Sequence, residues 1–419
     1  MKKFPHKTIL LSCLTMFGLL FNSCSVTGGN DINQNNMNLR TLSSPSGLYS
    51  QNYADASTGC YEIIKWSTGD ANILFNDLQS KQRVFLSSDL GSKHDDESDP
   101  SYIKTRSRGL SIFRSNEYLY VIGRGSYAKT VDELDYASFM EQRELTGGIR
   151  NRIELPSNVT FNETGAFATG DDKLYFTATV FNFNDSDNNI TYKYCLYSYN
   201  EKSGELSQFY TFDDINSVSI ISAYDNILLM QCIEKINNNY IRSIFVFDVS
   251  TSSMGKILEI DTSSSITAIK SKIYILDSSN KISEYDTKNN SVEDLSVIGE
   301  QNARTSFVAE PVDDNIFIYT HDDKSSEEAR YVFNTADKSL KEIDLYNDEG
   351  HFIGIYGRRG DYYFVITGEK LVSFKNIAPD HMTVFDDERV DYEYAWIKKS
   401  DYCNSIPNFE PIESKIEYR

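Results

Sequence analysis

Short apolar segments recur seven times along this chain, and the starting residues of successive segments lie 43 to 58 residues apart. The segments begin at Cys60, Tyr118, Lys173, Asn226, Lys272, Asn315 and Tyr362. Each is rich in β-branched and aromatic residues, which are typical of strands. Recurrence at this interval indicates one structural unit repeated along the chain, and such units bury a common core by packing against one another.

The clearest copy of the unit lies between Ser265 and Gly299. It contains four short strand-like runs: Ile266–Ile269, Lys272–Asp277, Ile282–Asp286 and Val292–Val297. Asn, Asp and Ser separate the runs, as expected for tight turns. Four antiparallel strands in a repeated unit are typical of a propeller blade. We therefore predict an all-β fold, a single β-propeller with seven four-stranded blades.

The third strand of the unit has its own signature, an aromatic residue followed directly by Asp or Asn. These polar residues are Asn76, Asn200, Asp248, Asp286 and Asn334. The second unit shows the signature poorly. The seventh carries a long insertion, Gly368 to Asp391, ahead of a third strand at Tyr392–Ile397. Rings of six or eight blades are alternatives to seven. A pair of β-sandwiches is the alternative architecture, and the regular spacing favours the ring.

Residues 1–23 have the pattern of an export signal. Three lysines in the first seven residues precede an apolar run, Ile9 to Phe21, which is shorter than the roughly 20 apolar residues that span a bilayer. The four residues that end at Cys24, FNSC, resemble the cleavage motif of a bacterial lipoprotein signal. That resemblance implies a diacylglycerol thioether on Cys24 and a lipid anchor on the extracytoplasmic face of the cell membrane. An ordinary secretory signal is the alternative.

A polar stretch rich in Gly, Asn and Ser follows the signal. We predict a flexible tether over residues 24–45 and the propeller domain over residues 46–419. Met37–Leu42 has a second interpretation, as an edge strand added to the domain. The formal net charge of −20 argues against nucleic acid as a partner.

Motifs for metal or nucleophilic chemistry are lacking in the sequence. The histidines that follow the signal are His94, His321, His351 and His381, and none belongs to a zinc-hydrolase motif. No nucleophile elbow is present. We therefore predict no metal, no cofactor and no catalytic residue.

Four cysteines lie in the domain: Cys60, Cys195, Cys232 and Cys403. In an oxidising compartment they permit two disulfides, and a bond between Cys60 and Cys403 would close the ring. The alternative is that they are strand-borne thiols, buried as small apolar residues.

The chain resembles a family of uncharacterised propeller lipoproteins of Gram-positive anaerobes, loosely similar to TolB-like propellers. The resemblance rests on the lipoprotein start, the strand repeats, the ending WIKKSDYCNSIPNFEPI and the stretch from Ile73 to Ile103. In that family the loop after the first blade carries the pattern C-x4-C-x-H-x4-C. The corresponding residues here are Ser87, Ser92, His94 and Asp99. Because the three thiols are missing, the resemblance implies no metal site or disulfide in this loop.

Two long neighbouring loops, Ser88–Arg108 and Gly123–Tyr136, are expected on one face of the propeller. The candidate ligand-binding residues on them are His94, Asp95, Asp96, Arg106, Arg108, Arg124 and Tyr127. Arginines on an acidic protein suit the recognition of carboxylate or phosphate. The alternative role of these arginines is to neutralise the neighbouring acids.

Two functions follow as hypotheses. The first is a membrane-anchored binding or scaffold module, whose loops hold a small ligand or a cell-surface protein while the blades support them. The second is an extracytoplasmic hydrolase or lyase acting on glycan or peptide, with carboxylates in the central funnel. The first is favoured because the expected innermost strands offer few acids, Glu310 among them.

Overall fold

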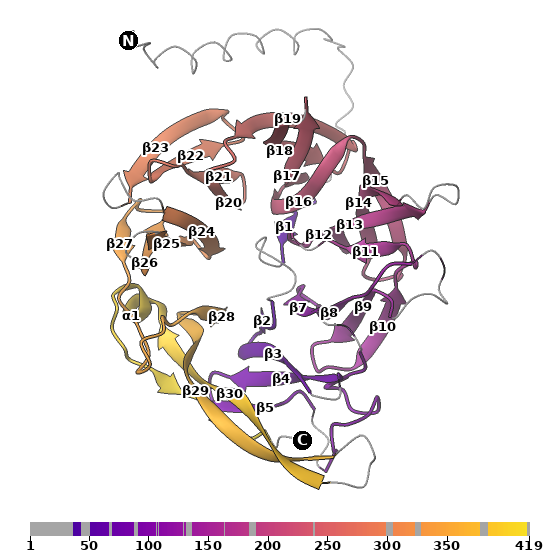
Figure 1. Cartoon of the computed structure of the whole chain (residues 1–419), viewed down its shortest axis with the longest axis vertical. Coiled ribbons are helices and arrows are strands. Elements are labelled where there is room, and N and C mark those ends of the chain that lie inside the picture. Colours follow the sequence, from indigo (N-terminus) through magenta and orange to yellow (C-terminus); the bar gives the residue numbers. More distant parts are fainter. Residues whose placement is uncertain are drawn as a thin grey trace, which may run out of the picture. The chain divides into compact units, whose positions relative to one another are not determined.

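The computed structural model describes residues 37–42, 51–66, 69–87, 91–105, 107, 109–128, 130, 136–162, 164–183, 190–237, 239–298, 305–322, 328–377 and 384–416. Met37–Arg419 is one compact unit. Within it, seven sheets are arranged around a common centre, each built on four antiparallel strands in sequence order from the centre outward (Figure 1). The sheets of blades one and three carry further short strands. The fold is therefore a seven-bladed β-propeller, and the prediction of seven four-stranded blades is confirmed.

The first four blades contain these strands, from the innermost outward. Blade one has β2 (Tyr53–Asp55), β3 (Gly59–Lys65), β4 (Ala71–Asp77) and β5 (Gln82–Phe85). Blade two has β7 (Gly109–Arg114), β8 (Tyr118–Arg124), β9 (Phe139–Glu144) and β10 (Ile149–Glu154). Blade three has β12 (Ala168–Gly170), β13 (Lys173–Phe183), β14 (Ile190–Asn200) and β15 (Leu206–Phe212). Blade four has β16 (Ile215–Tyr224), β17 (Ile227–Ile236), β18 (Asn239–Asp248) and β19 (Ser253–Ile260).

The remaining blades follow the same order. Blade five has β20 (Ser265–Ile269), β21 (Lys272–Leu276), β22 (Lys281–Asp286) and β23 (Ser291–Val297). Blade six has β24 (Thr305–Val312), β25 (Asn315–Asp322), β26 (Glu328–Asn334) and β27 (Leu340–Glu342). Blade seven has β28 (Ile355–Arg359), β29 (Tyr362–Ile377), β30 (Val384–Lys398) and β31 (Glu410–Pro411), with helix α1 (Lys399–Cys403) after β30. In the described part of the chain, no helix is both long and apolar enough to cross a membrane.

The second strands are the most buried because neighbouring blades cover both of their faces. In β8 every residue from Tyr118 to Gly123 is buried, whereas the outer strand β23 is mostly exposed. Aromatic side chains fill the space between blades two and three, where Phe113 stacks on Tyr120 and contacts Phe167. The apolar segments that recur in the sequence are therefore the second strands of the blades, which form the core between neighbouring blades.

Polar pairs form the turns between first and second strands, as the sequence predicts. Asp171 and Asp172 both have positive φ, 50° and 59°, the geometry of a type I′ hairpin turn. Asp225, Lys270 and Asp313 occupy left-handed conformations in the equivalent turns of blades four, five and six. Aspartate tolerates this conformation better than most residues, which suits it to these turns.

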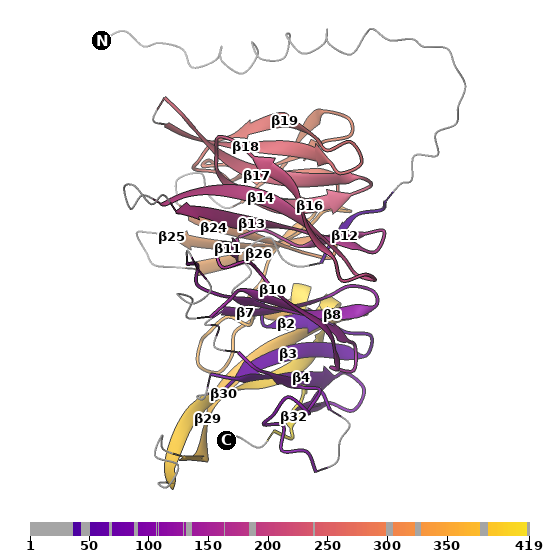
Figure 2. The same cartoon turned by 90° about the vertical axis from the view of Figure 1, so that its right-hand side faces the viewer.

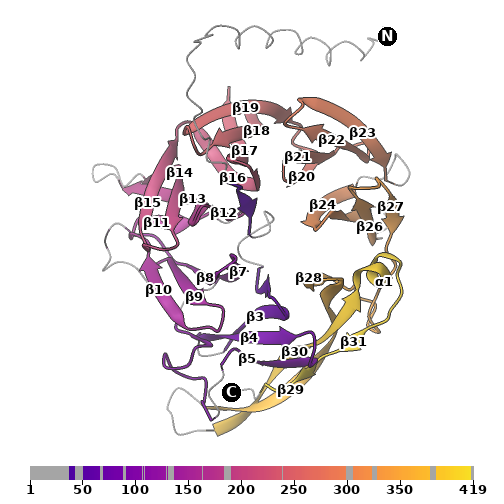
Figure 3. The same ribbon diagram turned by 180° about the vertical axis from the view of Figure 1, so that it is seen from behind.

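The N-terminal strand β1 (Arg40–Thr41) pairs with β12, the innermost strand of blade three (Figure 3). The amides of Met37 and Leu39 also donate hydrogen bonds to the turn at Asp225–Asn226. Of the two interpretations of Met37–Leu42, the structure takes the edge strand. The compact unit thus begins at Met37, earlier than the expected boundary at residue 46, because these backbone groups find partners on the inner strands.

The first and last blades meet without a disulfide between the described cysteines. β32 (Glu413–Ser414) adds in parallel to β5 at the outer edge of blade one. Cys60 and Cys403 are free thiols, so the disulfide considered between them does not form. Cys60 lies against Gly357 of blade seven, whereas Cys403 packs beside Phe317 and other residues of blades six and seven. The two cysteines therefore lie at different blade junctions, while buried Cys60, Cys195 and Cys232 match the alternative of apolar thiols.

Strands β29 and β30 continue far beyond their blade as a two-stranded ribbon (Figures 1 and 2). The predicted insertion, Gly368 to Asp391, forms the greater part of this ribbon. A register shift between Ile366 and Gly368 marks a β-bulge at its base, and bulges bend a strand. We call residues 368–377 with 384–393 the arm.

Candidate functional site

One side of the propeller carries the loops that the sequence singled out. Strands alternate in direction within each blade, so hairpins from second to third strands and connections between blades lie on the same side, which we call the loop face. The opposite side is the turn face. The arm and the β13–β14 hairpin both project toward the loop face (Figure 2). Loops on a rigid scaffold are the usual carriers of binding function.

The blade-one loop on this face is organised around the buried carboxylate of Asp99. Ser92 Oγ and His94 Nδ1 lie 2.5 and 2.7 Å from Asp99 Oδ2, and the amide and hydroxyl of Ser101 donate to Oδ1. An ionised carboxylate only accepts, so Nδ1 of His94 carries the proton. Burial opposes ionisation of Asp99, but these hydrogen bonds outweigh it and lower its pKa to about 2.

Three of the four positions that match the family's cysteine and histidine pattern thus meet in space. Ser92, His94 and Asp99 form a hydrogen-bonded cluster where the family carries thiols and imidazole. Hydroxyl and carboxylate oxygens replace the thiolates, and among the described residues no group of three or more His, Cys, Asp or Glu could hold a metal. The cluster fixes the loop by hydrogen bonds.

His94 is occupied by structural contacts. Its ring stacks on Phe85 with centroids 4.0 Å apart, and its carbonyl accepts a hydrogen bond from Asn72 Nδ2 at 3.1 Å. Its backbone adopts a left-handed conformation with φ 55°, which non-glycine residues seldom adopt. These contacts make His94 a residue that positions the loop.

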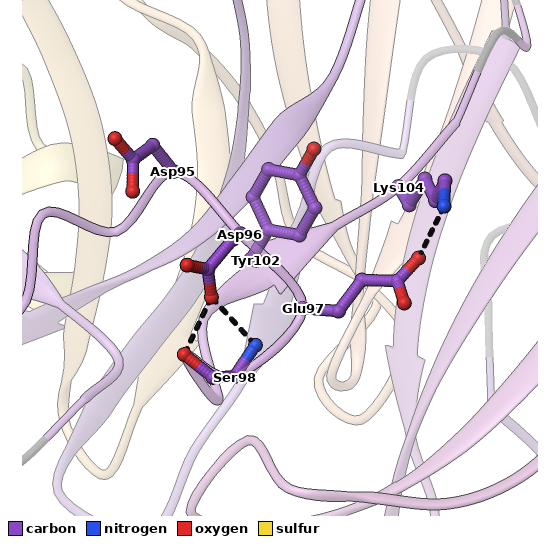
Figure 4. A pocket seen from close by; sticks show the side chains of 6 residues that line it. All are labelled: Asp95, Asp96, Glu97, Ser98, Tyr102 and Lys104. Carbon is purple, nitrogen blue, oxygen red and sulfur yellow. Dashed lines mark hydrogen bonds and ion pairs between the residues drawn. The ribbon is translucent and has the colours of Figure 1, made fainter.

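The loop surrounds a hollow of about 370 Å³ that opens to solvent (Figure 4). Its lining residues are Asp95, Asp96, Glu97, Ser98, Tyr102 and Lys104. Asp96 accepts hydrogen bonds from the amide and hydroxyl of Ser98, and Glu97 forms a 2.8 Å ion pair with Lys104. Three carboxylates against one ammonium make the hollow electronegative, so this part of the predicted site favours a cationic group over carboxylate or phosphate.

The other predicted residues form a separate group at the junction of blades two and three. Arg124 Nε lies 3.4 Å from Thr160 Oγ1, and Tyr127 stacks on Phe181 with centroids 3.6 Å apart. Thr160 belongs to β11 (Val159–Phe161), which pairs with β13. The side chains of Arg124 and Tyr127 therefore contact blade three, whereas the ring of His94 contacts Phe85 of blade one and Asp99 of its loop. Cys24, Arg106 and Arg108 lie outside the described residues.

The sequence does not predict the contact between the β3–β4 hairpin of blade one and the arm. Arg389 on β30 lies over the ring of Trp66, 5.5 Å from its centroid, and Arg389 Nη1 approaches the carbonyl of Lys65 at 3.4 Å. Trp66 in turn donates to Asn72, the residue that holds the carbonyl of His94. Trp66, one of only two tryptophans, is the local signal for this contact. Its partner is more than 300 residues away.

Exposed apolar side chains are concentrated on the loop face. Fourteen large hydrophobic residues are exposed in the described part of the chain, and eight belong to hairpins between second and third strands. The eight are Tyr127, Ile190, Tyr192, Ile236, Tyr240, Leu371, Val390 and Tyr392. Gathering of exposed apolar residues on one side of a soluble domain is typical of an interaction surface.

A pair of carboxylates near the innermost strands is already bound within the protein. Asp55 and Asp313 both form ion pairs with Arg358, at 2.8 and 3.1 Å, and Asp313 also contacts Lys399. This arrangement joins blades six, seven and one. It leaves these two carboxylates engaged in ring closure, which disfavours them as a hydrolytic pair. The side chain of Glu310 lies outside the described residues.

Comparison with known proteins yields likenesses of fold alone. No family model matches the chain, and no curated protein matches its sequence. The β-propeller domain of the Trilobed protease from Pyrococcus furiosus is 13% identical, covering 73% of this chain and 84% of its own, with a TM-score of 0.41. BamB from Moraxella catarrhalis is 11% identical, and the match covers 86% of this chain and 95% of BamB, with a TM-score of 0.39. A PL25 ulvan lyase is 10% identical, and the match covers 89% of this chain and 99% of the lyase, with a TM-score of 0.43.

These propellers include a component of a protease, a Bam protein and a lyase, so their functions differ. At such identities and scores they carry no argument about the function of this chain. The seven-bladed fold follows from the strand pairing itself. The chain is a seven-bladed β-propeller similar in fold to these proteins.

Proposed function

We propose that this protein is an extracytoplasmic binding module, anchored to the membrane through Cys24, that holds a partner protein on its loop face. The observation that carries the proposal is the concentration of exposed apolar side chains on the loop-face hairpins. Burial of such side chains against a partner provides the main driving force of association, at about 25 cal/mol per Å² of apolar area.

The blades supply the rigidity that such a surface needs. The core clusters bridge neighbouring blades, and the ring is closed by strand pairing at β32 and by the buried ion pair between Arg83 and Asp391. A preformed surface loses little conformational entropy on binding, which favours affinity. The electronegative hollow beside the blade-one loop adds a preference for basic groups at the edge of the interface.

Matched isoleucines test the proposal. Ile190 and Ile236 lie on loop-face hairpins, while Ile149 and Ile406 lie toward the turn face, and all four are 42 to 49% exposed. The double variant Ile190→Lys/Ile236→Lys is expected to remove the products of cell-surface crosslinking. Ile149→Lys/Ile406→Lys serves as the control and is expected to retain them. Equal crosslinking by both variants would place the interface away from the loop face.

A further inference from the structure

In the described part of the chain, no third strand pairs with the arm. From Gly368 to Ile377, β29 pairs only with β30, residue by residue to Val384. The fourth strand of blade seven, β31, pairs with β30 at Ala395 and Trp396 alone. In the described chain, the position of a fourth strand is therefore unfilled along the arm. Unpaired strand edges are templates for β-strand addition.

One face of the arm is fixed to blade one. Asp391 is 2% exposed and accepts a hydrogen bond at 3.1 Å from the guanidinium of Arg83, which is itself buried. Arg389, on the same face of the strand, packs over Trp66. These contacts hold the base of the arm in place before any partner binds.

The opposite face of the arm is apolar and exposed. Leu371 and Val390 are cross-strand neighbours, 63% and 47% exposed, and Tyr392 is 40% exposed. Proteins usually protect exposed edges with inward-pointing charges, proline or very short strands. Here apolar side chains lie beside a long edge, an arrangement that favours association over solvation.

Acidic residues flank this apolar face. Glu369 pairs with Tyr392, and Ser373 pairs with Glu388, so each end of the Leu371–Val390 pair carries an exposed carboxylate. A strand added beside β30 would therefore gain from apolar residues at its centre and from lysine or arginine on either side. This charge pattern identifies the chemistry of the occupant.

We propose that the arm binds an extended segment of a partner protein by β-strand addition to β30, completing the fourth strand of blade seven. The segment alternates apolar and polar residues and carries lysine or arginine at its flanks. The inference rests on the proposed binding function and names the kind of partner. Main-chain hydrogen bonds supply affinity, and the exposed side chains of Val390 and Tyr392 supply specificity.

A display library of short random peptides tests this proposal on the full chain. Selection is expected to enrich segments with alternating apolar residues and basic flanks, and replacing a central residue by proline should weaken an enriched peptide at least tenfold. Hydrogen exchange of the amides between Val384 and Glu393 is expected to slow when the peptide binds. Protection confined to other strands, or tolerance of proline, would overturn the proposal.

Two matched variants complete the test. Val390→Lys should weaken binding of the enriched peptide at least tenfold, whereas Val292→Lys, at a 63% exposed position on β23, should leave it unchanged. Equal effects of the two substitutions, or enrichment of the same peptides against the Val390→Lys protein, would contradict strand addition at the arm. Concentration-dependent dimerisation abolished by Val390→Lys would identify a second copy as the occupant and overturn the assignment. The proposed binding function would still hold in that case if the Ile190→Lys/Ile236→Lys variant lost its cell-surface crosslinks.

Discussion

Arg83 of blade one lies 3.1 Å from Asp391 of blade seven, 308 residues away in the chain, with Nη1 facing Oδ1. Arg83 also makes a two-point ion pair with Glu62, at 2.7 and 2.9 Å, and all three side chains are almost fully buried. Tyr394 donates to Glu62 from blade seven at 2.8 Å. The first and last blades are thus joined by a buried ionic network, and the same network fixes the base of the arm.

Replacing the arginine tests this closure. Arg83→Met leaves the carboxylates of Glu62 and Asp391 buried without their cation, which is expected to cost about 3 to 5 kcal/mol of unfolding free energy. Chemical denaturation measures the change. Lys81→Met, which breaks a half-buried ion pair with Glu410 at the surface, is the control and should cost less than about 1 kcal/mol. Equal losses in the two variants would show that the buried network does not stabilise the ring.

Asp99 gives the blade-one loop a defined pH dependence. The folded-state pKa of this carboxyl is depressed to about 2, below an unfolded value of about 3.9. Ionised Asp99 therefore contributes about 2 kcal/mol to the free energy of unfolding above pH 4, and this contribution is lost as the pH falls through 2. Asp99→Asn should destabilise the protein by that amount at pH 7, with the difference from wild type shrinking between pH 4 and pH 2. Asp95→Asn, at an exposed position, is the control. A difference that is constant with pH would contradict the assignment.

The sequence predicts the blades well because blade burial is periodic. The second strands are covered on both faces, so their apolar runs stand out, and the turns need residues that tolerate positive φ, such as Asp171 and Asp225. The sequence also predicts the position of the insertion in blade seven. It does not predict that the insertion forms a two-stranded ribbon, because the mixed polarity of Gly368–Asp391 has no strand or helix period.

The candidate site was only partly predictable. Long loops on one face follow from blade topology, and the convergence of Ser92, His94 and Asp99 follows from their close spacing. The contact of Trp66 with Arg389 depends on ring closure, which joins residues more than 300 positions apart. The rarity of tryptophan marks Trp66, but local sequence carries no signal for its partner. Exposure of hairpin residues such as Tyr240 depends likewise on what the fold leaves uncovered.

The four cysteines of the domain should behave as protected thiols. Burial raises the pKa of the Cys60 thiol well above its usual value and that of Cys232 to about 12, so little reactive thiolate forms at neutral pH. A thiol reagent is expected to label the domain slowly when native and at all four positions when denatured. Reducing agents should leave the unfolding temperature unchanged. A lower unfolding temperature after addition of the reducing agent would reveal a disulfide and contradict this prediction.

Membrane anchoring is a prediction about Cys24. Cys24→Ala removes the thiol that would receive the lipid, so the variant is expected to leave the membrane fraction or to accumulate unprocessed. Fractionation of cells followed by mass measurement of the N-terminus reports both outcomes. Normal processing together with full membrane association of Cys24→Ala would contradict the lipid anchor.

Site-specific photocrosslinking tests whether this propeller binds a partner through its loop face. A photoreactive amino acid is placed singly at Ile190, Ile236, Ile149 or Ile406 of the anchored protein on intact cells, positions of nearly equal exposure. Discrete crosslinked products are expected from the two loop-face positions and none from the other two. Products from Ile149 and Ile406, with none from Ile190 and Ile236, would contradict it.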